Sequence, residues 1–217
     1  AITVSSGDAA YVININYNRF VGNSALNPAN SALAASHAAG TVNATNNWWG
    51  CNTDPTTAGA CNRAAYITPP ATDAKLITNP WLQLKTTASP NPICNTAAGL
   101  GNTTTVTTSF LSNFAGTAIP VANLSTLISL PVTWGPTTLG TLSAQQATIQ
   151  ATGTATATFT SDGTGGSALV NTEVDNVPVA DLVARATITV NTLPTVTNPS
   201  NFTSCVGGTA TFTSTIT

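Results

Sequence analysis

The sequence predicts an all-β protein in which the coils of a solenoid precede a β-sandwich. Its 217 residues are rich in Thr, Val, Ile and Ala, and only 6% are charged. Such side chains fit pleated sheets, whereas exposed helices need charged residues. Near the N-terminus an alternating pattern recurs at a fixed spacing, which is typical of coils. Further along, short apolar runs separated by Gly, Asn and Pro are typical of a sandwich.

The small number of charges excludes several kinds of partner. The five Lys and Arg residues argue against binding to nucleic acids and anionic membranes, which need cationic patches. No apolar run approaches the ~20 residues of a spanning helix, so we expect no membrane insertion by this segment. The chain begins at Ala1 and contains no Met, and we interpret it as a processed or excerpted product.

A repeat near the N-terminus defines the expected coils. Ile13 and Ile15 alternate with asparagines, which predicts a strand with one buried face. The same order recurs later, and the equivalent pairs, each 29 positions apart, are Ile13 and Val42, Ile15 and Ala44, and Asn18 and Asn47. We therefore expect two coils that each end in an Asn bend. Residues 24–40 would loop out between them, and residues 51–79 would form a loop over their end.

Three motifs of this region carry a family resemblance. Residues 18–23 (NRFVGN), 42–50 (VNATNNWWG) and 80–82 (PWL) resemble the last coils of a right-handed parallel β-helix, of the pectin-lyase-like kind in bacterial and archaeal adhesin-like surface proteins. The resemblance implies that residues 1–88 are terminal coils whose exposed end is capped by Trp48, Trp49 and Trp81. The alternative for Trp48 and Trp49 is an aromatic platform that binds sugars.

The second part of the chain has the pattern of a sandwich. Strands are expected at 103–110, 119–124, 127–134, 147–160, 167–174 and 179–190. The segments LPVTWG (130–135), LGTLS (139–143), TGTATATFTSDGTGG (152–166), VDN (174–176) and ARATITV (184–190) resemble the immunoglobulin-like domains of invasin and intimin type. The resemblance implies one such domain over residues 89–192. Asp175 and Asn176 are interpreted as turn residues between two of its strands.

The last 25 residues start a similar pattern again. Residues 193–217 contain a Pro-rich linker followed by alternating Thr and apolar residues. We expect them to form the linker and first strands of a further immunoglobulin-like domain. Two strands cannot bury a core of their own, so this tail would need a longer chain or a partner.

The four cysteines predict one disulfide. Cys51 and Cys61 close a short loop with Thr, Gly and Asn, which predicts a local bridge and an oxidising, extracellular location at the cell surface. Cys94 and Cys205 are left open, each either a buried thiol or paired outside this chain. No CxxC pair occurs and His37 is the single histidine, so a zinc site is not expected.

The sequence does not predict an enzyme. Its seven carboxylates are spread along the chain, whereas catalysis needs convergent acids, bases or nucleophiles. Only Asp8 and Arg19 could contribute to a site on the expected coils, and His37 is interpreted as a solvated loop residue. We therefore expect no catalytic, cofactor-binding or metal-binding residues and no cofactor.

These observations predict a non-catalytic structural or adhesive segment of a large secreted cell-surface protein, that is, a stalk or an adhesin. Its expected partners are other surface proteins, glycans or copies of the chain itself. Two alternatives remain. The chain could form the C-terminal modules of a carbohydrate-active β-helix enzyme, a polysaccharide lyase or hydrolase with catalytic coils upstream. It could also be an extracellular filament subunit that assembles by strand addition.

Overall fold

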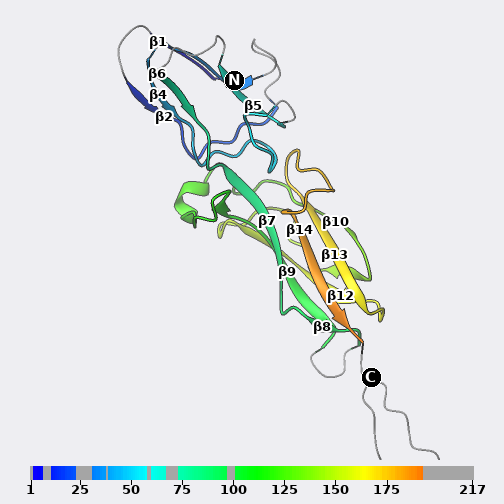
Figure 1. Ribbon diagram of the computed structural model, residues 1–217. Coiled ribbons are helices and arrows are strands. Elements are labelled where there is room, and N and C mark those ends of the chain that lie inside the picture. Colours follow the sequence, from blue (N-terminus) through cyan, green and yellow to red (C-terminus); the bar gives the residue numbers. More distant parts are fainter. Residues whose placement is uncertain are drawn as a thin grey trace, which may run out of the picture.

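The computed structural model describes residues 2–6, 11–22, 31–37, 39–57, 60–66, 73–96 and 101–192. In these residues the chain forms two all-β units that follow each other end to end (Figure 1). Asp8, Cys205 and the predicted strands of residues 193–217 lie outside the described residues. No helix in the described part is long and apolar enough to cross a membrane.

The first unit consists of six strands that alternate between two parallel sheets. One sheet has the order β1-β3-β5 and the other the order β2-β4-β6, so each odd strand pairs with the next odd strand and each even strand with the next even one. This alternation gives three successive coils of two strands each. The strands are β1 (Ile2–Ser6), β2 (Val12–Asn14), β3 (Ser31–His37), β4 (Ala39–Asn43), β5 (Arg63–Tyr66) and β6 (Asp73–Ile77).

The predicted spacing of the first two coils is confirmed by their register. Ile13 pairs with Val42, and the Asn18 main-chain N–H donates to Asn47 Oδ1 across 29 residues. The bend is repeated as well, because Tyr17 and Asn46 both have a positive φ, of 60° and 55°.

Two predicted loops of the first unit are wrong. Residues 24–40 were expected to loop out, but they contain β3 and the start of β4. The run from Ala32 to Ala35 is buried, because small apolar side chains suit the narrow space between two sheets. Residues 51–79 were expected to form a loop, but they contain β5 and β6, which make a third coil. His37 accordingly ends a strand and is not a loop residue.

Stacked polar side chains hold the bends of the first two coils together. Asn47 is fully buried, and its Nδ2 donates to the carbonyl oxygens of Ile15 and Ala44. Its Oδ1 accepts from the main chain and the side chain of Asn18. Since buried backbone groups need partners, this one amide satisfies the carbonyls that the bend turns away from the sheets.

The second unit is a sandwich of two four-stranded sheets. Their orders are β10-β13-β14-β8 and β11-β12-β9-β7, with all pairs antiparallel except β14 with β8. A short 3-10 helix, Val121–Leu124, follows β9. The strands are β7 (Leu82–Ser89), β8 (Ile93–Cys94), β9 (Thr103–Asn113), β10 (Thr133–Thr137), β11 (Gly140–Ser143), β12 (Thr154–Ser161), β13 (Gly166–Glu173) and β14 (Arg185–Asn191).

The sandwich begins earlier than expected and contains fewer strand residues. β7 pairs with β9 along its length, so residues 82–88, which were assigned to the coils, lie in the sandwich. The segment 119–124 was predicted as a strand but contains the 3-10 helix. Residues 127–132, 147–153 and 179–184, predicted as strand, are mainly turns, bends and irregular segments. Apolar residues of these segments, such as Leu124 and Ile149, are buried although they do not lie in strands. An apolar composition alone does not distinguish a strand from a buried turn or helix.

The strands of the sandwich alternate as their sequence predicts. In β12, Ala155, Ala157 and Phe159 are buried while the intervening Thr residues lie on the outer face. A group of buried hydroxyls also joins the two sheets, because Thr86 Oγ1 bonds Thr108 Oγ1 at 3.0 Å and Thr172 Oγ1 at 2.6 Å. These threonines satisfy one another, which removes the cost of burying a lone hydroxyl.

We predict that Asn47→Ala destabilises the coils by about 2–4 kcal/mol, because two buried carbonyls and the Asn18 N–H lose their partner. Chemical denaturation of the variant measures this change. Asn14→Ala is the matched control, since Asn14 Oδ1 accepts only the exposed bond from Asn43 Nδ2 and its loss costs little. Equal stability of the two variants would contradict the role of Asn47 in holding the two bends together.

Candidate functional site: the junction between the coils and the sandwich

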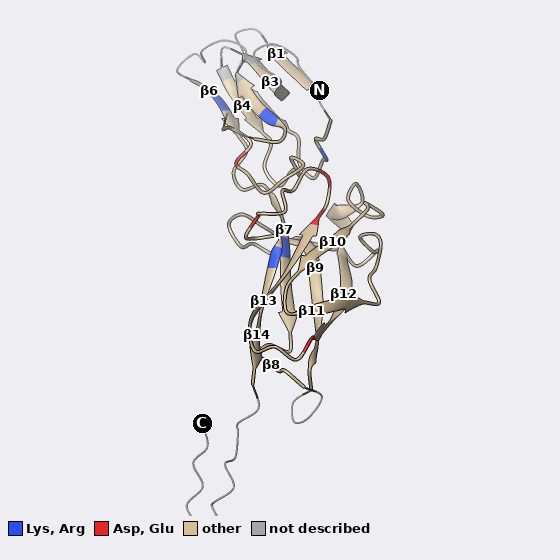
Figure 2. Cartoon of the chain, turned by 90° about the vertical axis from the view of Figure 1, so that its right-hand side faces the viewer, with Lys and Arg blue, Asp and Glu red and all other residues tan. Residues whose placement is uncertain are grey.

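The segment 46–52, which follows the second coil, lies against the near end of the sandwich. It meets the start of β7, the end of β9 and the loop between β13 and β14 (Figure 1). The described chain has few charged residues, and they are widely spaced (Figure 2). Several of them nevertheless gather at this junction.

Trp48 and Trp49 are adjacent in sequence but belong to different cores. Both are fully buried. Trp49 packs in the coil core, where its ring stacks on Phe20 with centroids 4.5 Å apart. Trp48 packs in the sandwich core, where its ring meets Phe110 edge-on with centroids 4.8 Å apart. Neither ring is therefore available as the sugar platform that was weighed as an alternative.

A buried carboxylate fixes the polar edge of Trp48. Its Nε1 donates to Asp175 Oδ2 at 2.7 Å, and Arg19 forms an ion pair with the same carboxylate through Nε and Nη2. The Asp175 side chain is only 6% exposed. Its hydrogen bond raises the pKa of Arg19, so this guanidinium stays charged. Asp175 has a φ of 58°, and the turn predicted at this residue thus also holds a buried partner for the coils.

The side-chain amide of Asn52 bonds the edge of β7 as the main chain of a neighbouring strand would. Its Nδ2 donates to Leu84 O at 3.0 Å, and its Oδ1 accepts from Leu84 N at 2.8 Å. The same Nδ2 lies 3.1 Å from Asp181 Oδ1, which also accepts from the main chain at Val183 and Ala184. One amide therefore ties the coils to both sheets of the sandwich.

The remaining contacts of the junction involve backbone and rings. Gly50 has a φ of 83°, and a Cβ there would lie 2.7 Å from Asn62 Nδ2; its carbonyl oxygen accepts from Asn176 N. Trp81 is 4% exposed, and its ring stacks on Phe114 with centroids 4.2 Å apart. Because these contacts come from several segments, a rotation of one unit against the other would break many of them together.

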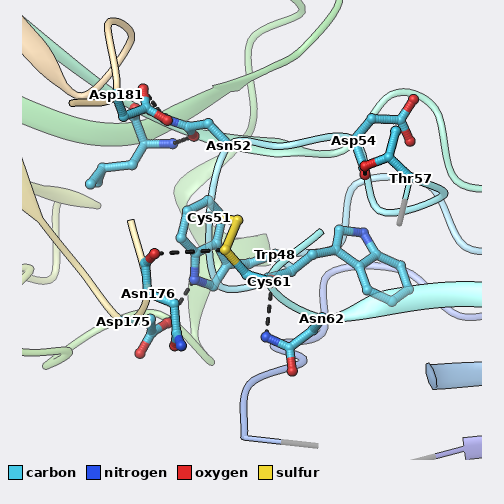
Figure 3. The surroundings of a disulfide bond; sticks show 12 residues. Trp48, Cys51, Asn52, Asp54, Thr57, Cys61, Asn62, Asp175, Asn176 and Asp181 are labelled. Carbon is cyan, nitrogen blue, oxygen red and sulfur yellow. Dashed lines mark hydrogen bonds between the residues drawn. A yellow bond between two sulfur atoms is a disulfide. The ribbon is translucent and has the colours of Figure 1, made fainter. Parts of the chain in front are cut away.

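The structure contains the predicted disulfide between Cys51 and Cys61, next to Trp48 (Figure 3). Cys51 is fully buried within the sandwich core cluster. Cys61 Sγ lies 3.6 Å from Asn176 O, a contact without a hydrogen bond because the sulfur carries no proton. The bridge closes the start of the third coil directly against the junction. Cys94 is a half-buried free thiol at the far end of the sandwich.

The junction brings together some residues that the sequence singled out and adds others. It contains Trp48, Trp81 and Cys51, while Trp49 lies in the coil core and Arg19 joins an ion pair. Sequence reasoning missed the roles of Asn52, Asp181 and Phe114, since their partners are distant in the chain. No cluster of three or more His, Cys, Asp or Glu that could hold a metal occurs among the described residues.

Comparison with solved structures finds bacterial adhesins. The Yersinia pseudotuberculosis adhesin InvE is 26% identical, with a TM-score of 0.36, and the match covers 52% of this chain and 27% of InvE. Invasin, described as a bacterial integrin-binding protein, is 24% identical, with a TM-score of 0.34 and coverage of 54% and 22%. The D00-D0 domain of intimin is 17% identical, with a TM-score of 0.35 and coverage of 54% of each chain.

These matches cover about half of the chain, and the chain spans about a quarter of InvE and of invasin. All three TM-scores lie below 0.5, so no role is transferred from them. No protein-family model matches the chain, and a search of the curated proteins finds no match.

We predict that Trp48→Ala destabilises the protein by about 3–5 kcal/mol, as loss of a large buried aromatic does. Trp48→Phe keeps an aromatic ring but removes the bond from Nε1 to Asp175 and part of the buried volume, so its cost should be smaller, about 1–3 kcal/mol. Thermal and chemical unfolding of both variants measures the difference. An unchanged melting temperature for Trp48→Ala would show that the ring is not part of a continuous core.

We predict that loss of the Cys51–Cys61 bridge lowers stability by about 2–3 kcal/mol, as the closure of a short loop implies. Intact mass and peptide mapping with and without reductant identify the bond, and unfolding of Cys51→Ser with Cys61→Ser measures its effect. Cys94→Ser is the control, because this thiol makes no bridge among the described residues. Free thiols at both positions in the oxidised protein would refute the pairing.

Proposed function

We propose that this chain is a non-catalytic structural and adhesive segment of a large secreted cell-surface protein. The observation that carries the proposal is the interlocked junction, where Trp48, Asn52 and Asp175 join the two units through buried contacts. A flexible linker would be enough for two modules that only needed to be tethered. A fixed connection instead suits a stalk that holds a binding region at a set distance.

The junction resists bending because its polar contacts are shielded. The ion pair between Arg19 and Asp175 holds a carboxylate that is 6% exposed, and the Asn52 side chain is buried between β7 and Asp181. A bend that separates these groups without admitting water would leave them buried and unpaired, and a wider opening would expose the apolar ring of Trp48 to water. Each unpaired buried group costs about 1–3 kcal/mol, so the bent state is strongly disfavoured.

Within this proposal, the first unit is the end of a longer parallel β-helix and the second is an immunoglobulin-like domain. The alternation of β1-β3-β5 with β2-β4-β6 supports the first assignment. The sandwich of two four-stranded sheets supports the second. Trp48, Trp49 and Trp81 are then the cap: they fill the end of the coils and seal it against the next domain.

We predict that the two units move as one body. Spin labels at Lys75→Cys on β6 and Thr187→Cys on β14, both exposed, in a Cys94→Ser and Cys205→Ser background, should give one narrow distance peak by double electron–electron resonance. Asn52→Ala combined with Asp175→Ala should broaden the peak, because it removes the polar ties of the junction. Thr141→Ala, exposed on β11, is the matched control and should leave the peak unchanged.

A broad distribution in the parent protein would contradict the stalk proposal. The enzyme alternative has a separate readout, the release of reducing or unsaturated ends from a panel of polysaccharides. Turnover that is lost in Arg19→Gln would overturn the non-catalytic assignment. The filament alternative would be favoured instead by assembly that depends on residues 193–217.

A further inference from the structure

A groove of about 450 Å³ lies at the rim of the junction, on the outer side of β7. This volume falls within the range of small-ligand sites. The groove is formed by the first half of β7, the end of β9 and the segment that leads into β14. The residues that define its chemistry are Gln83, Lys85, Ser112, Phe114, Leu182 and Arg185.

The groove concentrates positive charge in a chain that has little. Lys85 and Arg185 are two of the five cations of the protein, and no Asp or Glu lines the groove. Lys85 lies on β7 and Arg185 on β14, and both line the groove; Figure 2 shows two blue segments close together near the label of β7. Among the described residues only Arg19 forms an ion pair. Two like charges that share one cavity without a carboxylate favour an anion between them.

Asp181, the acidic residue nearest to Arg185 in sequence, forms no ion pair with Lys85 or Arg185 among the described residues. Asp181 Oδ1 accepts hydrogen bonds from Asn52 Nδ2, Val183 N and Ala184 N. Arg185 is held in place by its Nε, which donates to Asn171 Oδ1 at 2.8 Å. Its Nη2 also donates to Val179 O at 3.5 Å, so the guanidinium is held at two points. The N–H groups that remain on Nη1 and Nη2 suit hydrogen bonds to a carboxylate or sulfate.

An aromatic ring forms the apolar part of the groove. Phe114 stacks on Trp81 on one side, yet 52% of the residue is exposed. Its other face is thus open to a ligand while the ring itself is held. Leu182 lies nearby and is 75% exposed. Ordered apolar surface beside two cations fits a ligand that has both a flat apolar face and an acidic group.

The edge of β7 is closed to a peptide strand. The N–H groups of Leu82, Leu84 and Thr86, which point outward from the sheet, already donate to Asn47 O, Asn52 Oδ1 and Val183 O. A peptide that bound here by strand addition would find no free main-chain donors on these residues. A ligand must be recognised by side chains instead, and Gln83 and Ser112 line the groove with an amide and a hydroxyl.

We propose that this groove binds an acidic saccharide, with its carboxylate or sulfate between Lys85 and Arg185 and a sugar ring against Phe114. A sugar ring has an apolar C–H face that packs on an aromatic ring, and its hydroxyls match the polar groups of Gln83 and Ser112. The site extends the adhesive part of the proposed function. Its failure is distinguishable from failure of the stalk, because the spin-label distances do not depend on a ligand.

The test is isothermal titration calorimetry of the full chain with trigalacturonate and with its methyl ester, in which each carboxylate is replaced by an uncharged ester. We expect binding of the acid and at least a tenfold weaker affinity for the ester, the effect of losing a charge-assisted hydrogen bond. A heparin tetrasaccharide is the second arm and decides between carboxylate and sulfate as the preferred anion. Stronger binding of either acidic probe than of the ester supports the site.

Variants locate the binding in the groove. Lys85→Gln should weaken it about tenfold, and Phe114→Leu should weaken it while leaving the fold intact, as far-ultraviolet circular dichroism would verify. Lys75→Gln removes an exposed cation on β6 and should have no effect. The proposal is overturned if neither acidic probe binds, if the ester binds equally well, if Lys75→Gln and Lys85→Gln weaken binding alike, or if an acidic peptide competes fully for the groove.

Discussion

Two consecutive tryptophans that enter opposite cores are the constraint on which the structure depends. Side chains of successive residues in an extended segment point to opposite sides, so Trp48 and Trp49 fill the sandwich and the coils at once. Each ring is fully buried. The main chain between them therefore cannot shift without opening a cavity in one core or the other, and such cavities are costly in close-packed interiors.

Polar groups at this boundary define how the two units are oriented relative to each other. Apolar contacts alone are not directional, whereas the bonds of Trp48 to Asp175 and of Asn52 to Leu84 each allow one geometry. Buried ion pairs can be neutral for stability and still favour one arrangement over others. We consider that the pair of Arg19 and Asp175 has this role, because the carboxylate already has a partner in the Trp48 ring.

The sequence predicted what repeats locally and missed what is made by distant partners. The 29-residue spacing, the Asn bends, the alternating strands β9 and β12, and the Cys51–Cys61 bridge were all visible in the order of residues. Three features were not. β3 consists mainly of Ala and Ser, so its sequence resembled that of a loop. β7 joins the sandwich only through pairing with β9. Asn52 takes its role from Leu84 and Asp181, and an isolated Asn carries no signal for it.

The rigid junction and the groove at its rim have a common physical basis. Phe114 can present an ordered ring because Trp81 supports it, and Trp81 is in turn fixed by its Nε1, which donates to Asn52 O. Arg185 belongs to the strand that follows the Asp181 turn, which Asn52 also holds. The contacts that stiffen the junction thus order the groove before any ligand arrives. Preorganisation of this kind reduces the entropy lost on binding, so a stiff connection and a shallow binding site are compatible demands on the same few residues.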